Sequence, residues 1–161
     1  MKRVLSILLL TVLTVCLFGC TSTGKKTNMS NFADGAGKDW KLIEVSIAGT
    51  FNREIIFDRS ALSKEGAGNY FTLRYDAQNI AGTAAPNRYS APYTLGENHE
   101  IKLPYPIRTT LMATIFQPEK LPEHEFYGYL QNVYAWRNVN GNLELRAKTE
   151  DDREVRLLFG L

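Results

Sequence analysis

Polar and apolar residues alternate with a period of two along much of the chain. Residues 71–75 read Phe-Thr-Leu-Arg-Tyr, and the alternation recurs at 101–103, 143–146 and 155–159, after an opening strand at 40–45. A period of two gives each strand one buried face and one wetted face. Such strands are typical of an antiparallel sheet. Asn140-Gly141 lies between two of them and predicts a two-residue hairpin, because both residues tolerate positive φ.

One segment departs from this pattern and predicts a helix. Pro122 suits a first helical turn, and the carboxylates of Glu123 and Glu125 favour the positive end of the helix dipole. Apolar residues then follow at helical spacing, namely Phe126, Tyr129, Leu130 and Val133. We therefore expect an α+β fold in which a strongly bent antiparallel β-sheet, close to a barrel, carries one amphipathic helix packed on it.

The beginning of the chain has the pattern of an export signal. Lys2 and Arg3 precede an apolar run that ends in Leu17-Phe18-Gly19-Cys20 and is followed by polar residues. The run is shorter than the roughly 20 residues that a membrane-spanning helix requires. Its end resembles the lipobox of bacterial lipoproteins, which implies that residues 1–19 are removed and that Cys20 is acylated. The alternative is an ordinary signal peptide that is cut further along, near Ser22 or Gly24.

The rest of the chain divides into a tether and one domain. Residues 20–38 are rich in Thr, Ser, Gly, Lys and Asn, with only Met29 and Phe32 to bury, so they predict a flexible tether behind the acylated Cys20. Residues 39–161 are long enough for a single independent core. No Asp follows Cys20, which favours the outer membrane if the cell has one. The expected location is therefore the bacterial cell envelope, with the protein bound to the membrane through its N-terminal lipid.

Composition excludes several classes of function. Removal of Lys2 and Arg3 lowers the 19 basic residues to 17, which equals the 17 acidic residues, so no net positive field remains to attract nucleic acid. Both cysteines of the chain lie at or before position 20, which leaves the domain without a thiol, a disulfide or a cysteine metal ligand. No serine-hydrolase motif occurs and the two histidines suggest no metal site, so we expect neither an enzyme nor a cofactor.

Three sequence blocks carry a family resemblance. The domain opens with Trp40-Lys41-Leu42, its middle reads Ala85-Pro86-Asn87-Arg88-Tyr89-Ser90-Ala91-Pro92-Tyr93, and Thr110-Leu111-Met112-Ala113-Thr114 follows. In this order and spacing the blocks resemble the META domain of HslJ-like heat-shock lipoproteins. The resemblance implies association with stress response, without a known mechanism. The two family cysteines are absent here, where Pro86 and Thr114 stand in their places.

The resemblance marks candidate site residues. These are Asn87, Tyr89, Tyr93, Thr110 and Met112, as structural residues or as ligand contacts. A structural role is favoured for Asn87, which accepts strained turns, and for Tyr89, which packs well in a strand. Glu123-His124-Glu125 cannot converge on one atom, because neighbours on a helix point about 100° apart. We expect these three residues to form a solvated first turn.

Two functions remain open after these exclusions. The first is a non-catalytic envelope lipoprotein that acts through contacts with another envelope protein in stress tolerance or envelope maintenance. It predicts that Tyr127, which lies off the apolar helix stripe, belongs to an exposed patch. The second is a module that binds a small apolar molecule at the membrane surface. It predicts a pocket of several hundred cubic ångströms, on the order of a typical ligand site, between helix and sheet.

Overall fold

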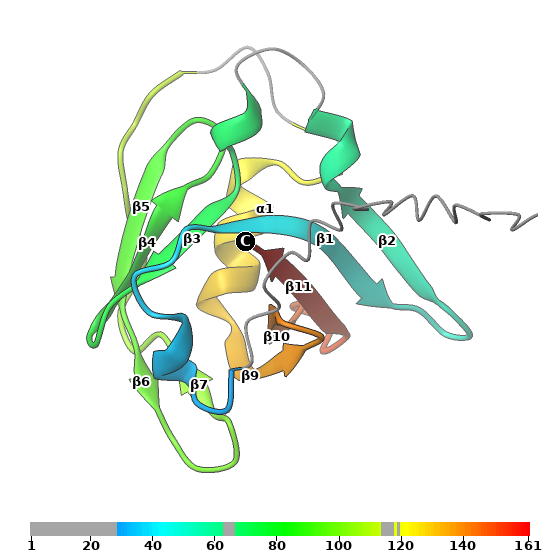
Figure 1. Cartoon of the computed structure of the whole chain (residues 1–161). Coiled ribbons are helices and arrows are strands. Elements are labelled where there is room, and N and C mark those ends of the chain that lie inside the picture. The colour runs from blue at the N-terminus through cyan, green and yellow to red at the C-terminus, as the bar shows by residue number, and fades with distance from the viewer. Residues whose placement is uncertain (1–28, 63–66, 114–117, 119) are drawn as a thin grey trace, which may run out of the picture.

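The computed structural model describes residues 29–62, 67–113, 118 and 120–161, and confirms an α+β fold (Figure 1). Its main sheet has nine strands in the order β8-β5-β4-β3-β1-β11-β10-β9, with β2 also paired to β1. All of the pairings are antiparallel. The strands are β1 (Trp40–Ala48), β2 (Arg53–Asp58), β3 (Thr72–Tyr75), β4 (Asn79–Thr83), β5 (Arg88–Pro92), β8 (Arg108–Thr109), β9 (Val133–Val139), β10 (Asn142–Lys148) and β11 (Glu154–Gly160).

A small hairpin and short helical turns complete the fold. Strands β6 (Thr94–Leu95) and β7 (Ile101–Lys102) pair only with each other. One isolated bridge, between Glu100 and Ala135, links this hairpin to β9. The main sheet is not closed, because its end strands β8 and β9 do not pair in the described part of the chain, and a near-barrel is therefore not confirmed. The 3-10 turns are η1 (Phe32–Gly35), η2 (Arg59–Leu62) and η3 (Ala67–Asn69).

The predicted helix is present as α1 (Glu123–Gln131) and lies within the bend of the sheet, with β3–β5 on one side and β9–β11 on the other (Figure 1). Phe126 and Leu130 are fully buried. The ring of Phe126 lies 5.1 Å from that of Phe71 and 5.7 Å from that of Tyr89. Val133 does not extend the helical stripe as expected, since it begins β9. The helix is therefore held by aromatic packing, which contributes more than helix propensity in so short an element.

The predicted hairpin at Asn140-Gly141 is also confirmed. Both residues have positive φ, 54° and 89° respectively, and they join β9 to β10. The amide of Gly141 donates to the side-chain oxygen of Asn138 at 2.8 Å. The local sequence alone therefore set this turn and the register of the two strands that it connects.

The predicted tether is too long at its C-terminal end. Met29 and Phe32 are buried, and the ring of Phe32 stacks on Tyr75 with centroids 4.1 Å apart. Asn31 and Asp34 form a capping box around η1, and the indole of Trp40 donates to the carbonyl oxygen of Gly35 at 3.0 Å. Residues 29–38 thus belong to the domain, because one buried aromatic ring and a satisfied cap outweigh a polar composition. Cys20, the signal segment 1–19 and residues 20–28 lie outside the described residues.

Candidate functional site

Three of the five candidate residues from the family-like blocks meet at one end of α1. Asn87 directly precedes β5, Thr110 and Met112 directly follow β8, and β5 pairs with β8. Glu123 is the first residue of α1 and faces the same point. We call these four residues the Asn87–Glu123 clasp.

Asn87 is the centre of the clasp. Its Oδ1 accepts hydrogen bonds from the amide of Met112 at 2.6 Å and from the hydroxyl of Thr110 at 2.8 Å. Its Nδ2 donates to Oε2 of Glu123 at 2.7 Å and to the carbonyl oxygen of Met112 at 3.2 Å. One amide side chain therefore joins the loop after β8 to the start of the helix. Asn87 is only 6% exposed, so its bonds are protected from competition with water.

Glu123 supplies the negative end of the clasp. Its Oε1 accepts from the backbone amides of Asn87 at 2.8 Å and Ala85 at 3.0 Å. The residue is only 9% exposed, so the expected solvated first turn is wrong for Glu123, although His124 and Glu125 are exposed. The sequence held a signal for this, since Glu123, Phe126 and Leu130 are spaced i, i+3 and i+7 and share the buried face of the helix. A carboxylate on that face needs donors, and the clasp provides them.

The clasp holds a loop in place. The three side-chain oxygens of Asn87 and Glu123 and the side-chain amide of Asn87 all take part in the bonds above. The clasp positions the short segment after β8, in which Leu111 is 96% exposed and Met112 is 60% exposed. Two apolar side chains are thus held outward by a buried polar network.

Tyr89 and Tyr93 lie apart from the clasp and each bonds to the backbone. The hydroxyl of Tyr89 donates to the carbonyl oxygen of Thr72 at 2.8 Å, and that of Tyr93 donates to the carbonyl oxygen of Asp76 at 2.6 Å. Tyr89 is buried, and this burial raises the pKa of its hydroxyl far above the ordinary value. The Tyr89 hydroxyl ties β5 to β3, the Tyr93 hydroxyl ties the end of β5 to the β3–β4 turn, and neither is available as an acid at neutral pH.

Tyr127 does not form the exposed patch that was expected. It is half-buried, and its ring lies 5.9 Å from that of Tyr89 and 6.1 Å from that of Phe126. Burial and the charge of Glu123 raise its pKa. The residue falls off the main helix stripe, but the bent sheet wraps far enough around α1 to cover this flank as well.

A lattice of ion pairs crosses the outer face of β9, β10 and β11, and sequence reasoning missed it. Nε of Arg137 lies 2.7 Å from Oε1 of Glu144, and Nε of Arg146 lies 3.4 Å from the same oxygen. Arg146 also reaches Oε2 of Glu154, at 3.4 Å from its Nη2. The side chain of Glu144 is only 6% exposed, so this pair is shielded from solvent more than a surface ion pair.

The lattice continues from Glu154 towards β2. Oε1 of Glu154 lies 2.6 Å from Nη2 of Arg53 and 3.0 Å from Nε of Arg156, and the hydroxyl of Tyr134 donates to its Oε2 at 3.0 Å. Partial burial opposes ionisation of Glu154, but these bonds and the nearby arginine charges together hold its pKa below the ordinary value. We call the set Arg53, Arg137, Glu144, Arg146, Glu154 and Arg156 the arginine lattice. It carries four positive charges and two negative ones.

The described surface carries several open hollows. The largest that we describe, about 370 Å³, lies between the outer side of α1 and the β10–β11 turn. Its lining is charged and includes Glu125, Lys148 and Arg153, with Tyr129 at its floor. Burial and a hydrogen bond with Glu125 raise the pKa of Tyr129 to about 12. On the inner side of the helix, the side chains of Phe126 and Leu130 are fully buried against the sheet.

Metal and membrane features were also sought in the described residues. They hold no group of three or more His, Cys, Asp or Glu side chains arranged to bind a metal ion. Within the same residues, none of the helices has the length and apolar content needed to traverse a bilayer.

Fold and site together define a small α+β domain in which Asn87, Thr110, Met112 and Glu123 form a structural clasp. No family model and no curated protein matches the chain. Among solved structures it is similar to the NMR structure of a protein from Burkholderia xenovorans, with a TM-score of 0.53 and 14% identity over 78% of this chain and 83% of that one. A crystal structure of a DUF4847 family protein from Bacteroides vulgatus has a TM-score of 0.48 and 13% identity over 77% of this chain and 93% of that one. The first likeness shows that the fold occurs elsewhere.

Proposed function

We propose that the protein is a lipid-anchored envelope protein whose non-catalytic domain acts through contacts with another protein. The lipobox-like end of the signal segment supports acylation at Cys20, and Thr21 supports an outer-membrane location where the cell has one. Two or more acyl chains would hold the domain stably at the membrane surface. The role in stress tolerance or envelope maintenance follows from the META resemblance.

The arginine lattice carries the proposal of a protein contact. Arginine and tyrosine are enriched in protein interfaces, and Arg53, Arg137 and Arg156 stand with Tyr134 on one sheet face. Because Glu144 and Glu154 already fix these guanidinium groups, a partner would not have to order them on binding. The excess of two positive charges favours a partner with an acidic surface.

Membership of the META family is part of the same proposal. The residues that carry the resemblance are far apart in sequence, yet Asn87, Thr110 and Met112 lie in one hydrogen-bonded cluster. A shared structural role would explain why these residue types occur together.

We also propose that the bend of the sheet approaches that of a barrel, which the bridge between Glu100 and Ala135 supports.

The test is site-specific photocrosslinking of the full chain in living cells. A photoreactive residue at Ile55, which is 54% exposed on β2 beside the lattice, is compared with one at Leu111, on the loop after β8. We expect one recurrent protein adduct from position 55 that is absent from position 111. It should fall about tenfold with Arg137→Gln, remain with the exposed Arg153→Gln, and vanish when Cys20→Ala removes the anchor. The same adducts from both positions, or no adduct at 55, would refute the proposed contact.

A further inference from the structure

The outer face of the other half of the sheet carries only positive charges on its strands. Strands β3, β4, β5 and β8 contain no Asp or Glu. Arg74, Arg88 and Arg108 are all exposed, and the register places Arg74 opposite Ala81, Ala81 opposite Ser90, and Ser90 opposite Arg108, in one row. Arg88 stands two residues before Ser90 and therefore points to the same side of the sheet.

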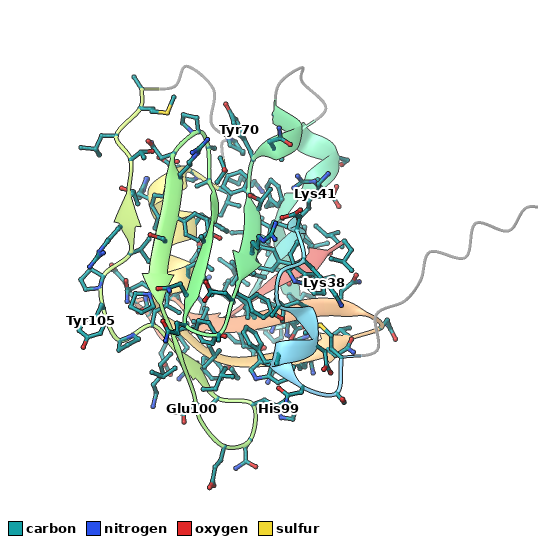
Figure 2. The ribbon with its side chains drawn as sticks, turned by 60° about the vertical axis from the view of Figure 1, so that its left-hand side comes forward. Lys38, Lys41, Tyr70, His99, Glu100 and Tyr105 are labelled. Carbon is teal, nitrogen blue, oxygen red and sulfur yellow. The ribbon has the colours of Figure 1, made fainter. Side chains whose placement is uncertain are left out.

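Lys41 extends this row of cations onto β1. It pairs with Thr72, which is two residues before Arg74 and shares its face. Figure 2 turns this half of the sheet forward and shows Lys41 where β1 passes β3. We call Lys41, Arg74, Arg88 and Arg108 the basic face. Among the described residues, its one ion pair joins Arg74 to Asp39 at 3.2 Å, between side chains that are 60% and 76% exposed.

The basic face differs from the arginine lattice in how its charges are compensated. Each lattice arginine has a carboxylate oxygen within 3.4 Å. Arg88 and Arg108 have no carboxylate partner among the described residues. They flank a shallow hollow of about 250 Å³ whose wall includes Ser90 and Thr110. Two guanidinium groups without a carboxylate partner, next to the hydroxyl group of Ser90, match the oxygens of a phosphate group.

The edge of the basic face carries exposed apolar side chains. Thr110 lies opposite Arg88, and its amide donates to the carbonyl oxygen of Arg88 at 3.0 Å. The exposed residues Leu111 and Met112 follow Thr110. The clasp fixes Met112 through both its amide and its carbonyl group, so the apolar pair cannot fold back onto the sheet without breaking those bonds. Cations beside outward apolar residues are the composition of surfaces that rest at the interface of an anionic membrane.

We propose that the basic face docks on an anionic lipid bilayer, with lipid phosphates between Arg88 and Arg108 and with Leu111 and Met112 entering the headgroup region. This inference goes beyond the proposed function, because it assigns the half of the sheet that the arginine lattice does not use. Nucleic acid shares the phosphate chemistry, but it offers no place for the aliphatic Leu111 and Met112. Bilayer docking would leave the lattice facing away from the membrane, on the other side of α1 (Figure 1).

The test measures vesicle binding, by co-sedimentation, of an unacylated chain that begins at Thr21 and so lacks both the signal segment and the lipid. Vesicles of phosphatidylglycerol and phosphatidylethanolamine are compared with vesicles of phosphatidylcholine alone. Each arginine near an anionic surface contributes about fivefold in affinity, so the Arg88→Gln/Arg108→Gln chain should bind the anionic vesicles about 25-fold more weakly. The matched control is Lys148→Gln/Arg153→Gln, which removes the same charge from exposed residues at the β10–β11 turn and should lose less than about twofold.

Leu111→Ser separates a bilayer from other sources of phosphate. It should weaken binding to anionic vesicles at least about threefold and leave binding of inorganic phosphate and of duplex DNA unchanged. Equal losses in the two double variants would reduce the effect to net charge and overturn the proposal. Tighter binding of duplex DNA than of vesicles, sensitive to Arg88 and Arg108 but not to Leu111, would make nucleic acid the occupant. Failure here leaves the crosslinking test of the arginine lattice unaffected.

Discussion

The side-chain amide of Asn87 donates to the carboxylate of Glu123 across 2.7 Å in a buried site, and this bond joins residues 36 positions apart. Glu123 also receives two backbone amides from the same segment, from Ala85 and Asn87. Three donors on one carboxylate, two of them from rigid backbone, make this a specified contact that fixes where α1 begins relative to β5. The start of the helix is therefore set by a side chain from a distant strand.

Removing the charge of Glu123 should destabilise the fold. Glu123→Gln can keep an oxygen for the two backbone amides only by placing its NH₂ group against the donor Nδ2 of Asn87, so at least one buried donor loses its acceptor, and we expect the free energy of unfolding to fall by about 2–4 kcal/mol. His124→Gln, at the neighbouring exposed position, should change it by less than about 0.5 kcal/mol. Urea denaturation followed by tryptophan fluorescence measures both. Equal small effects would show that the clasp contributes little.

The sequence predicted those parts of the fold that depend on local periodicity. The alternating strands, the amphipathic helix and the Asn140-Gly141 turn all follow from spacings within a few residues, and all are present. The clasp could be predicted only in part. Asn87, Thr110 and Met112 were marked by resemblance, but their meeting with Glu123 depends on the pairing of β5 with β8, which no local spacing encodes.

The clustering of cations on one face of the sheet could not be predicted from the sequence, for a similar reason. Net charge is close to zero and the signs mix along the chain, yet Arg88 and Arg108 lie together without a carboxylate because their paired strands β5 and β8, and the neighbouring β4, contain none. The burial of Tyr127 likewise depends on how far the sheet curves around α1. Each of these features arises from strand order and curvature.

Phe32 tests where the domain begins. Its ring is 1% exposed and packs against Tyr75 and Trp136, so Phe32→Ala should lower the free energy of unfolding by about 3–5 kcal/mol. Phe51→Ala is the matched control, because Phe51 is 95% exposed at the β1–β2 turn and should cost less than about 0.5 kcal/mol. Thermal unfolding of both variants compares them. If the two variants had similar melting temperatures, residues 29–38 would belong to the flexible tether and not to the folded domain.

The arginine lattice predicts a specific dependence of stability on pH. The pKa of Glu154 in the folded protein is below its ordinary value of 4.5, so its stabilisation is present above pH 4.5 and is lost as the pH falls through the folded value. Glu154→Gln should therefore cost about 1 kcal/mol at pH 7, and the difference from wild type should be smaller at an acid pH below 4.5. Urea titrations at both pH values measure the two differences. A constant difference would show that the cost of the substitution is steric.

The same titrations require a control without a lattice contact. Glu150 is exposed near the β10–β11 turn, and Glu150→Gln should follow the wild-type stability at both pH values. If Glu150→Gln reproduced the loss seen with Glu154→Gln, the effect would belong to net charge, and the bonds to Arg53 and Arg156 would not be its cause.

Two glycines give opposite expectations for the same substitution. A Cβ on Gly82 would overlap the carbonyl oxygen of Thr72 and crowd the ring of Tyr89, whose hydroxyl bonds to that oxygen. Because the obstacle is backbone and cannot swing away, Gly82→Ala should destabilise the protein by about 3 kcal/mol. A Cβ on Gly128 would meet open space on the exposed side of α1, so Gly128→Ala should raise stability by about 0.5–1 kcal/mol through helix propensity. Urea denaturation of the pair tests the β3–β4–β5 packing and the helix together, and a loss of stability at position 128 would contradict the placement of that helix face in solvent.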